Sequence, residues 1–357
     1  MRRLPLAAVL AAFFIFLVVS VSVRQGVLLL VGAGMGAVLA GARFGFTTGW
    51  RQLIEQRNPQ GVVGQVLLLA LASLAAFPLL GQFSELHAAL GPPSISLLVG
   101  AFVFGLTMQI ADGCGSGTLY KAGLGVPLNM GILPLFAAGS FLGSVHLDKW
   151  LALGQTEPVS LSANLGTVPA LGLTLALLAA ALVAVRLWVG PGRSWIGKRW
   201  IWGAIALAAL ATINLVLAGQ PWGVVYGFGL WGAKAATSLG LFDPAANAFW
   251  SQTGNAQRLT QTVLLDVTTI TNLGILGGAL WVSAKAGNDS KPLTGRQWVV
   301  GLIAGFLLGY SSRLAFGCNV GAMVSGISTG SLHGWLWVPL AFAGTLIGVR
   351  VRRHYQF

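Results

Sequence analysis

Residues 105–123 read GLTMQIADGCGSGTLYKAG, and residues 309–327 read GYSSRLAFGCNVGAMVSGI. These stretches contain the only two cysteines of the chain, Cys114 and Cys318. Without a gap, four further residues of the first stretch match identical residues of the second, namely Gly105, Ala111, Gly113 and Gly117 with Gly309, Ala315, Gly317 and Gly321. Chance matches of glycine are easy among 50 glycines, but chance rarely aligns both cysteines as well. The chain therefore contains an internal repeat.

The composition predicts a membrane protein. Charged residues make up 8% of the chain, against about 25% in soluble proteins, and the mean hydropathy is +0.79. Several apolar runs reach about 20 residues, the length that crosses about 30 Å of hydrocarbon. Lipid offers no partners to backbone groups, so spanning segments are helices or closed barrels, and continuous apolar runs exclude a barrel. We predict an all-α, polytopic transmembrane protein in which residues 1–357 form a single membrane domain in the lipid bilayer.

The net charge of +13 has a topological explanation. Lys and Arg mark cytoplasmic loops, and a positive interior also favours anions. The chain lacks the basic–aromatic clusters that stack bases, so no nucleic acid is expected. Two cysteines without CxxC or HExxH spacing predict no metal site, and nothing indicates a cofactor. No GxxxxGK loop or Ser/His/Asp constellation is present, so we do not expect an enzyme.

Eleven apolar runs are candidate spans: 4–23, 27–46, 62–80, 94–112, 130–145, 168–189, 201–217, 224–241, 263–283, 298–316 and 335–349. The first repeat is expected over 26–146 and the second over 221–350. Basic loops fall at opposite positions in the two copies, which predicts inverted repeats. Eleven crossings would place the basic C-terminus outside, so at least one run must fail to cross. The runs flanking the cysteines and the region of Pro221 are the candidates.

Each cysteine follows a predicted membrane helix within a glycine-rich loop. Glycine is a poor helix former, so we expect broken helices here, with a new helix starting near Thr118 in the first copy and Ala322 in the second. A helix start exposes N–H groups that favour an anion, and a thiol is a weak hydrogen-bond donor. The predicted substrate-binding residues are Cys114, Cys318, Gly113, Gly115, Gly117, Gly317, Asn319, Gly321 and Lys234. The plainer alternative makes the cysteines small buried residues and the glycines packing contacts.

Five ionisable residues stand in apolar surroundings, where charges are costly and commonly functional: Asp112, Lys121, Lys234, Asp266 and Arg313. Asp112 and Lys121 could instead lie at a helix end near water. Lys234 could attract an anion or pair with Asp266.

The motif ADGCGSGTLYKAG, its partner AFGCNVGAMVSGISTGSLHGW and the segment PWGVVYGFGLWGAK resemble the YeeE/YedE sulfur transport family. The resemblance implies a bacterial inner-membrane protein with inverted repeats that takes up thiosulfate or a related sulfur anion. It also implies that Cys114 and Cys318 line the transport path, and that a TusA-like cytoplasmic sulfur carrier protein is a partner.

The resemblance has one gap. A third pathway cysteine of some thiosulfate importers has no counterpart here, which leaves other sulfur oxyanions, sulfane sulfur or a selenium compound open as substrates. Two further alternatives are a membrane thiol–disulfide redox protein using the cysteine pair, although CxxC spacing is absent, and an assembly subunit.

Overall fold

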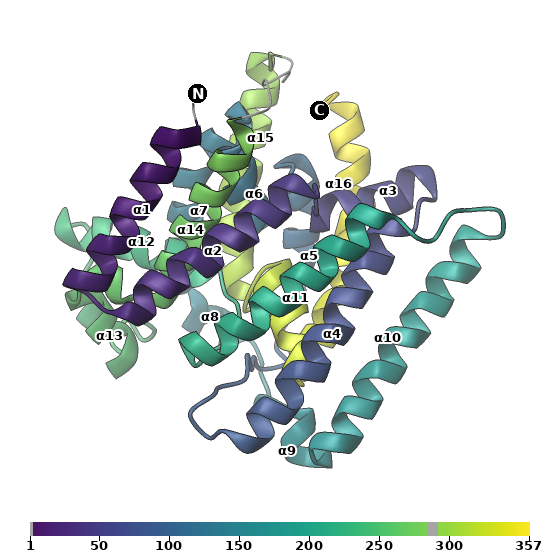
Figure 1. Cartoon of the computed structure of the whole chain (residues 1–357), viewed down its shortest axis with the longest axis horizontal. Coiled ribbons are helices and arrows are strands. Elements are labelled where there is room, and N and C mark those ends of the chain that lie inside the picture. The colour runs from purple at the N-terminus through teal and green to yellow at the C-terminus, as the bar shows by residue number, and fades with distance from the viewer. Residues whose placement is uncertain (1–2, 285–291) are drawn as a thin grey trace.

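The computed structural model describes residues 3–284 and 292–357, whose regular elements beyond isolated bridges are all helical (Figure 1). The all-α prediction is confirmed. The elements of the first half are α1 (Arg3–Ser20), α2 (Val23–Gly41), α3 (Phe46–Gln56), α4 (Gln60–Gln82), α5 (Ile95–Ile110), α6 (Gly115–Gly123), α7 (Pro127–Val145), α8 (Leu147–Leu151), α9 (Leu161–Leu165) and α10 (Thr167–Val189). Those of the second half are α11 (Lys198–Ala218), α12 (Val225–Ser238), η1 (Pro244–Ala246), α13 (Thr253–Thr260), η2 (Val263–Leu265), α14 (Val267–Ser283), α15 (Gly295–Leu314), the π-helix η3 (Asn319–Gly326) and α16 (Leu332–His354).

Eight helical stretches of the described chain are long and apolar enough to cross a membrane. They are 23–56, 60–82, 95–123, 127–145, 167–189, 198–218, 295–326 and 332–354. The apolar helices α1 and α14 are shorter. The predicted run 224–241 becomes α12, which is the shortest of the main helices formed by the eleven runs; its 14 residues cover about 21 Å at 1.5 Å per residue, less than the hydrocarbon thickness. The protein is a multi-pass membrane protein.

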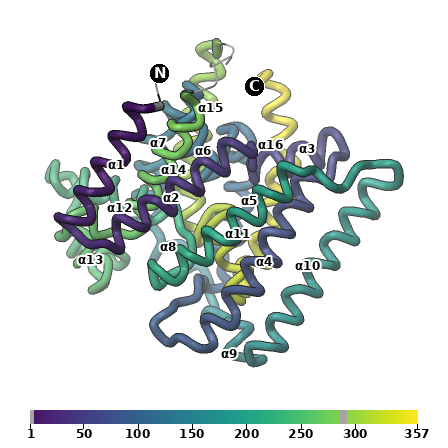
Figure 2. The backbone as a smooth tube through the Cα atoms, in the orientation of Figure 1, coloured from purple at the N-terminus to yellow at the C-terminus, as the bar shows by residue number. Residues whose placement is uncertain are grey.

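The two ends of the chain lie at the same side of the molecule. In Figures 1 and 2, α1 begins and α16 ends at the top, whereas α9 and the link between α4 and α5 lie at the bottom. This arrangement fits an even number of crossings. Three of the eleven predicted runs are outside the eight stretches, namely those that became α1, α12 and α14, and they account for the difference from eleven.

One predicted span is interrupted in the structure. The apolar run 27–46 was expected to be a single helix, but α2 ends at Gly41 and α3 begins at Phe46. Arg43 between them has a φ of 50° and therefore adopts the left-handed conformation, which ends a right-handed helix. The amphipathic helix α3 then turns away from the direction of α2 (Figure 1).

Glycines allow two pairs of long helices to cross at backbone contact. Gly105 of α5 packs on α16, where an added Cβ would lie only 1.9 Å from the carbonyl oxygen of Ala341. Gly309 of α15 packs on α7 in the same way, 2.2 Å from the carbonyl oxygen of Phe136. Small residues permit such close approach between membrane helices, so these glycines serve packing.

Two further glycines on each partner helix complete these crossings. Gly139 and Gly143 of α7 face α15, and Gly344 and Gly348 of α16 face α5. Their added Cβ atoms would lie 2.0–2.6 Å from carbonyl oxygens of the opposite helix, which belong to Phe306, Tyr310, Phe102 and Leu106. The two crossings therefore use equivalent positions of the two copies. Each contact position of α5 has its counterpart in α15 204 residues later, and each contact position of α7 has its counterpart in α16 205 residues later.

Candidate functional site

The two cysteine loops have the same backbone conformation. Helix α5 ends at Ile110 and Cys114 is the N-cap of α6, with φ −86° and ψ −167°. Helix α15 ends at Leu314 and Cys318 is the N-cap of η3, with φ −95° and ψ −167°. Two residues before each cysteine, Asp112 and Phe316 both adopt the left-handed conformation, with φ 53° and 56°.

The hydrogen bonds that start the two short helices also match. The Thr118 N–H donates to the carbonyl of Cys114, and the Ala322 N–H donates to the carbonyl of Cys318, both at 2.8 Å. The helices restart directly after the cysteines, a few residues earlier than the expected starts near Thr118 and Ala322. Each cysteine therefore lies where a helix N-terminus presents free N–H groups.

The glycine before each cysteine is required by the tight turn. A Cβ at Gly113 would lie 2.9 Å from the amide nitrogen of Thr118, and one at Gly317 would lie 2.5 Å from that of Ala322. Gly317 also has a φ of 151°, which side chains rarely adopt. Backbone, rather than a movable side chain, would be displaced in both cases.

The two thiols face one another in the interior. Both cysteines are free and buried, with 1% of Cys114 and 0% of Cys318 exposed. The Cβ position of Gly115, the first residue of α6, lies 3.3 Å from the Cys318 sulfur. The hydroxyl oxygen of Ser116 lies 3.4 Å from the Cys114 sulfur. The structure thus brings together the two residues that the sequence placed in separate copies.

Backbone N–H groups of both short helices are directed at the sulfurs. Those of Val320, Gly321 and Gly115 point toward Cys318, and that of Gly117 points toward Cys114. The positive ends of α6 and η3 thereby converge on the thiol pair. This combination of N–H groups, thiols and helix dipoles suits a polarisable anion.

Asn319 adds an unpartnered amide to this site. It follows Cys318, is 0% exposed, and neither its Nδ2 nor its Oδ1 has a hydrogen-bond partner in the described protein. An unsatisfied buried polar group costs about 1–3 kcal/mol, so native structures seldom retain one without a use. The amide can donate to an anion held beside Cys318.

A cavity of about 580 Å³ lies beside the Cys318 loop. Gly317 and Gly321 form part of its wall, and the link between α4 and α5 contributes residues 87–90 and 92. Arg258 and Arg313 also line it, and none of the described lining residues is a carboxylate. The cavity is therefore electropositive.

Asp112 is the centre of a cluster of ionised side chains. Its carboxylate lies 2.8 Å from Arg51, 2.6 Å from Lys121 and 3.3 Å from Arg352, measured to the side-chain nitrogens. The four side chains are only 14–23% exposed. Sequence reasoning identified Asp112 and Lys121 but missed both arginines, because nothing in the sequence brings residues 51 and 352 together.

Lys234 has other partners than those considered from the sequence. Its ammonium donates at 2.5 Å to the carbonyls of Leu259 and Gln261. Asp266 instead caps α14, accepting from the N–H and hydroxyl of Thr269 at 2.7 and 2.8 Å. Lys234 is absent from the described wall of the cavity beside Cys318, and its role in binding stays a prediction.

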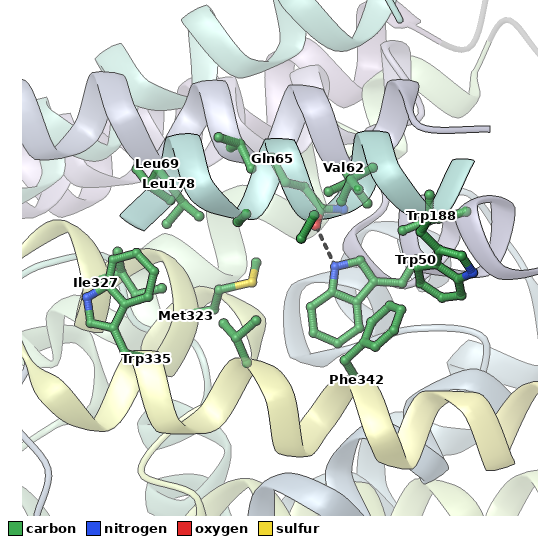
Figure 3. A pocket seen from close by; sticks show the side chains of 16 residues that line it. Trp50, Val62, Gln65, Leu69, Leu178, Trp188, Met323, Ile327, Trp335 and Phe342 are labelled. Atoms are coloured by element: carbon green, nitrogen blue, oxygen red, sulfur yellow. Dashed lines mark hydrogen bonds between the residues drawn. The ribbon is translucent and has the colours of Figure 1, made fainter. Parts of the chain in front are cut away.

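A second cavity, of about 270 Å³, is apolar and lies between α3, α4, α10 and α16 (Figure 3). Met323 of η3 and Ile327, which directly follows η3, line this cavity, and its main polar contact is internal, since Trp50 donates to Gln65 at 2.8 Å. No Lys or Arg is among its described lining residues. A dianion would lose its hydration there without compensation, so this cavity does not suit an anion.

Comparisons with known proteins agree with these features. The model of a family described as sulphur transport matches residues 41–347. The thiosulfate transporter TsuA of Escherichia coli (strain K12) is 25% identical over 366 aligned positions, covering 91% of this chain and 95% of the relative. TsuA of Spirochaeta thermophila is 27% identical over 330 positions, covering 86% and 93%. The probable transporter YedE of Escherichia coli is 27% identical over 167 positions, covering 46% and 40%.

Proposed function

The chain belongs to the sulphur transport family, and from this premise we propose that it imports thiosulfate or a closely related sulfur anion along a path lined by Cys114 and Cys318. Membership of this family indicates a transporter rather than an enzyme. Two relatives matched over most of their length carry the name thiosulfate transporter, which supports the choice of substrate.

The observation that carries the proposal is the meeting of the two cysteine loops. Their thiols face one another at the N-termini of α6 and η3, beside the unpartnered amide of Asn319. A dianion between these helix ends gains N–H donors and the positive ends of two dipoles. Binding needs no bond to sulfur, because each thiol acts as a weak donor to the soft terminal sulfur of thiosulfate.

We also propose that residues 26–146 and 221–350 are inverted repeats with broken membrane helices at the cysteines. The matched glycine crossings and the matched loop conformations support this proposal. In that arrangement α6 and η3 approach the centre from opposite sides. A substrate passing from one helix end to the other then meets one thiol after the other.

The side that carries both chain ends is proposed to face the cytoplasm of a bacterial inner membrane. Arg350, Arg352 and Arg353 lie at the end of α16, and basic residues mark the inside. A TusA-like sulfur carrier is the proposed partner on this face, where it would receive the imported sulfur.

Uptake of radiolabelled thiosulfate by proteoliposomes tests the function. Wild-type protein is expected to accumulate the label, and Cys114→Ala and Cys318→Ala are expected to lose most of the uptake. Ser73→Ala is a matched control, since Ser73 is buried in α4 and donates only to the carbonyl of Leu69. Equal uptake by both cysteine variants and wild type would refute the cysteine roles. Competition by unlabelled sulfite, sulfate and selenite identifies the preferred anion, including a selenium compound.

The facing thiols also support a second candidate, a membrane thiol–disulfide protein. This function requires that the Cys114 and Cys318 thiols be oxidised to a disulfide, with their two electrons and two protons passed to an oxidising redox partner. Mild oxidation of membranes followed by mass analysis of the peptides tests it. Absence of the linked peptide, together with cysteine-dependent uptake, would eliminate this candidate.

A further inference from the structure

We propose that the apolar cavity between α3, α4, α10 and α16 holds one acyl chain of an anionic phospholipid, whose phosphate is bound by Arg57 at the basic end of the cavity. The cavity of Figure 3 does not suit the transported anion. The lipid site therefore lies beside the proposed transport path, and its existence does not depend on the proposed function.

The cavity is apolar over about the depth of one leaflet. Its volume is about 270 Å³, and the part of its wall that belongs to α10 extends from Leu178 to Trp188. Ten residues at 1.5 Å each give about 15 Å, half of the roughly 30 Å of hydrocarbon in a bilayer. The polar groups of Trp50 and Gln65 in the wall hydrogen-bond to each other at 2.8 Å. A chain of methylenes therefore matches this wall, because it brings no polar group that would lose its hydration.

The cavity lies where the bilayer can reach it from the side. Helix α10 runs along the edge of the molecule in Figures 1 and 2 and is the least buried of the eight described candidate spans. Its buried residues are Ala170, Thr174 and Leu178 alone. It packs along α4 and α9 but not closely on α16, which supplies another wall of the cavity. A lipid chain can therefore enter between α10 and α16 without opening the core.

Arg57 places a positive charge at one end of the cavity. Trp188 lines the cavity from the last turn of α10, and the guanidinium carbon of Arg57 lies 4.9 Å from the centre of its ring. The Nη1 of Arg57 donates to the Trp188 carbonyl at 3.1 Å, which holds the side chain in this place. In the described part of the chain no carboxylate pairs with Arg57. Its remaining N–H donors can bind a phosphate.

The surroundings of Arg57 favour an anionic lipid over a zwitterionic one. Residues 186–200, which end α10 and begin α11, include Arg186, Arg193, Lys198 and Arg199 but no Asp or Glu. This end of α10 lies on the side proposed to face the cytoplasm, whose leaflet carries the anionic lipids. The charge of the protein and that of the lipid head group are therefore complementary.

A chain in the cavity also contacts the helix that begins at Cys318. Met323 of η3 and Ile327, which follows it, line the cavity, and Figure 3 shows the Met323 side chain among the other lining residues. A bound chain supplies dispersion contacts that these side chains otherwise lack. Because it binds only the folded protein, the lipid is expected to raise the melting temperature.

Native mass spectrometry of delipidated protein with added phosphatidylglycerol tests the site. The wild type should retain phosphatidylglycerol, and inorganic phosphate should not displace it, since free phosphate lacks the chain that fills the cavity. Ala181→Phe and Ala184→Phe place a ring in the cavity from exposed positions of α10, and both should lose most of the bound lipid. Ala179→Phe is the matched control, because Ala179 is exposed on the same helix and does not line the cavity.

The charge is tested by comparing phosphatidylglycerol with phosphatidylcholine of the same chains. Arg57→Gln should lower the affinity for phosphatidylglycerol about tenfold, the loss of one charged hydrogen-bonding group, and leave that for phosphatidylcholine unchanged. Arg296→Gln removes a cation that likewise lies over an aromatic ring, that of Tyr355, and should change neither affinity.

Thermal melting gives a second readout. Phosphatidylglycerol should raise the melting temperature of the wild type but not that of Ala181→Phe. Equal lipid binding by the wild type, Ala181→Phe and Ala184→Phe would overturn the site, and equal affinity of the wild type for the two lipids would overturn its anionic ligand. A dimer that is lost in Ala181→Phe, with no lipid bound, would assign the cavity to a second copy instead. None of these measurements uses thiosulfate, so the transport function stands or falls separately.

Discussion

Gly115→Ala places one methyl group in the space between the two helix ends. The new Cβ would lie 3.3 Å from the Cys318 sulfur, 3.2 Å from a methyl of Val224 and 3.6 Å from the ring of Phe136. All three neighbours are side-chain atoms that need to move only a few tenths of an ångström. Replacing glycine by alanine in a helix is favourable by about 0.5–1 kcal/mol, which offsets this crowding. We expect a folded protein whose stability changes by less than about 1 kcal/mol.

Transport should nevertheless fall sharply in Gly115→Ala. A methyl carbon 3.3 Å from the sulfur occupies the position from which an anion would contact both the thiol and the Gly115 N–H. Because the methyl group would block the anion from several N–H donors at once, we expect uptake to fall about tenfold or more. Initial rates of thiosulfate uptake, with thermal melting of the purified protein, separate the two effects.

Two neighbouring glycines supply the controls. Gly117→Ala meets only the Cys114 sulfur at 3.5 Å, an ordinary contact, and should retain more uptake than Gly115→Ala. Gly113→Ala would press against backbone at 2.9 Å and should lower the melting temperature itself. If Gly115→Ala is folded and transports at the wild-type rate, the anion does not pass between α6 and Cys318, and the reasoning is refuted.

Three other substitutions test separate features. Asp112→Asn leaves three clustered cations without a carboxylate, so the free energy of unfolding should fall by about 3–5 kcal/mol, seen as a lower melting temperature. The control Glu55→Gln breaks an ion pair whose arginine is 61% exposed and should change the melting temperature little. In Gly309→Ala the new Cβ would lie 2.2 Å from a carbonyl oxygen of α7, so α15 must move away, and the stability should fall by about 1–3 kcal/mol. Gly172→Ala places its Cβ in open space and should lose no stability. Equal melting temperatures of the two variants would contradict this packing. Asn319→Ala removes two buried polar atoms that have no hydrogen-bond partner, so it should not lower the stability, but it should lower uptake because an amide donor to the anion is lost. Unchanged uptake would show that this amide does not bind the substrate.

The helices were largely predictable because each apolar run must satisfy its own backbone in lipid. The runs 168–189 and 94–112 became α10 and α5 with ends shifted by at most two residues. The break at Arg43 was missed because hydropathy does not report a left-handed residue. The short helices α8, α9 and α13 were also missed, since they lie in polar links that carry no apolar period.

The cysteine pair was predictable in part, because both loops carry the same glycine pattern around a rare residue type. The surroundings of Asp112 were not, since the partners Arg51 and Arg352 are separated from it by 61 and 240 positions. Pairing across such distances depends on how helices pack, which composition does not specify. The same reason explains why the partners of Lys234 were not predicted, since the carbonyls at 259 and 261 reach it through the placement of α13.

The π-helical winding of η3 absorbs an inserted residue. Its equivalent α6 is an ordinary α-helix, yet matched positions change from 204 residues apart before η3 to 205 after it. One extra residue in an α-helix would rotate everything beyond it by about 100°, and a π-turn takes up that residue locally. Gly344 and Gly348 consequently still face α5. The second copy could therefore diverge in length directly beside Cys318 without loss of the frame that holds both thiols in place.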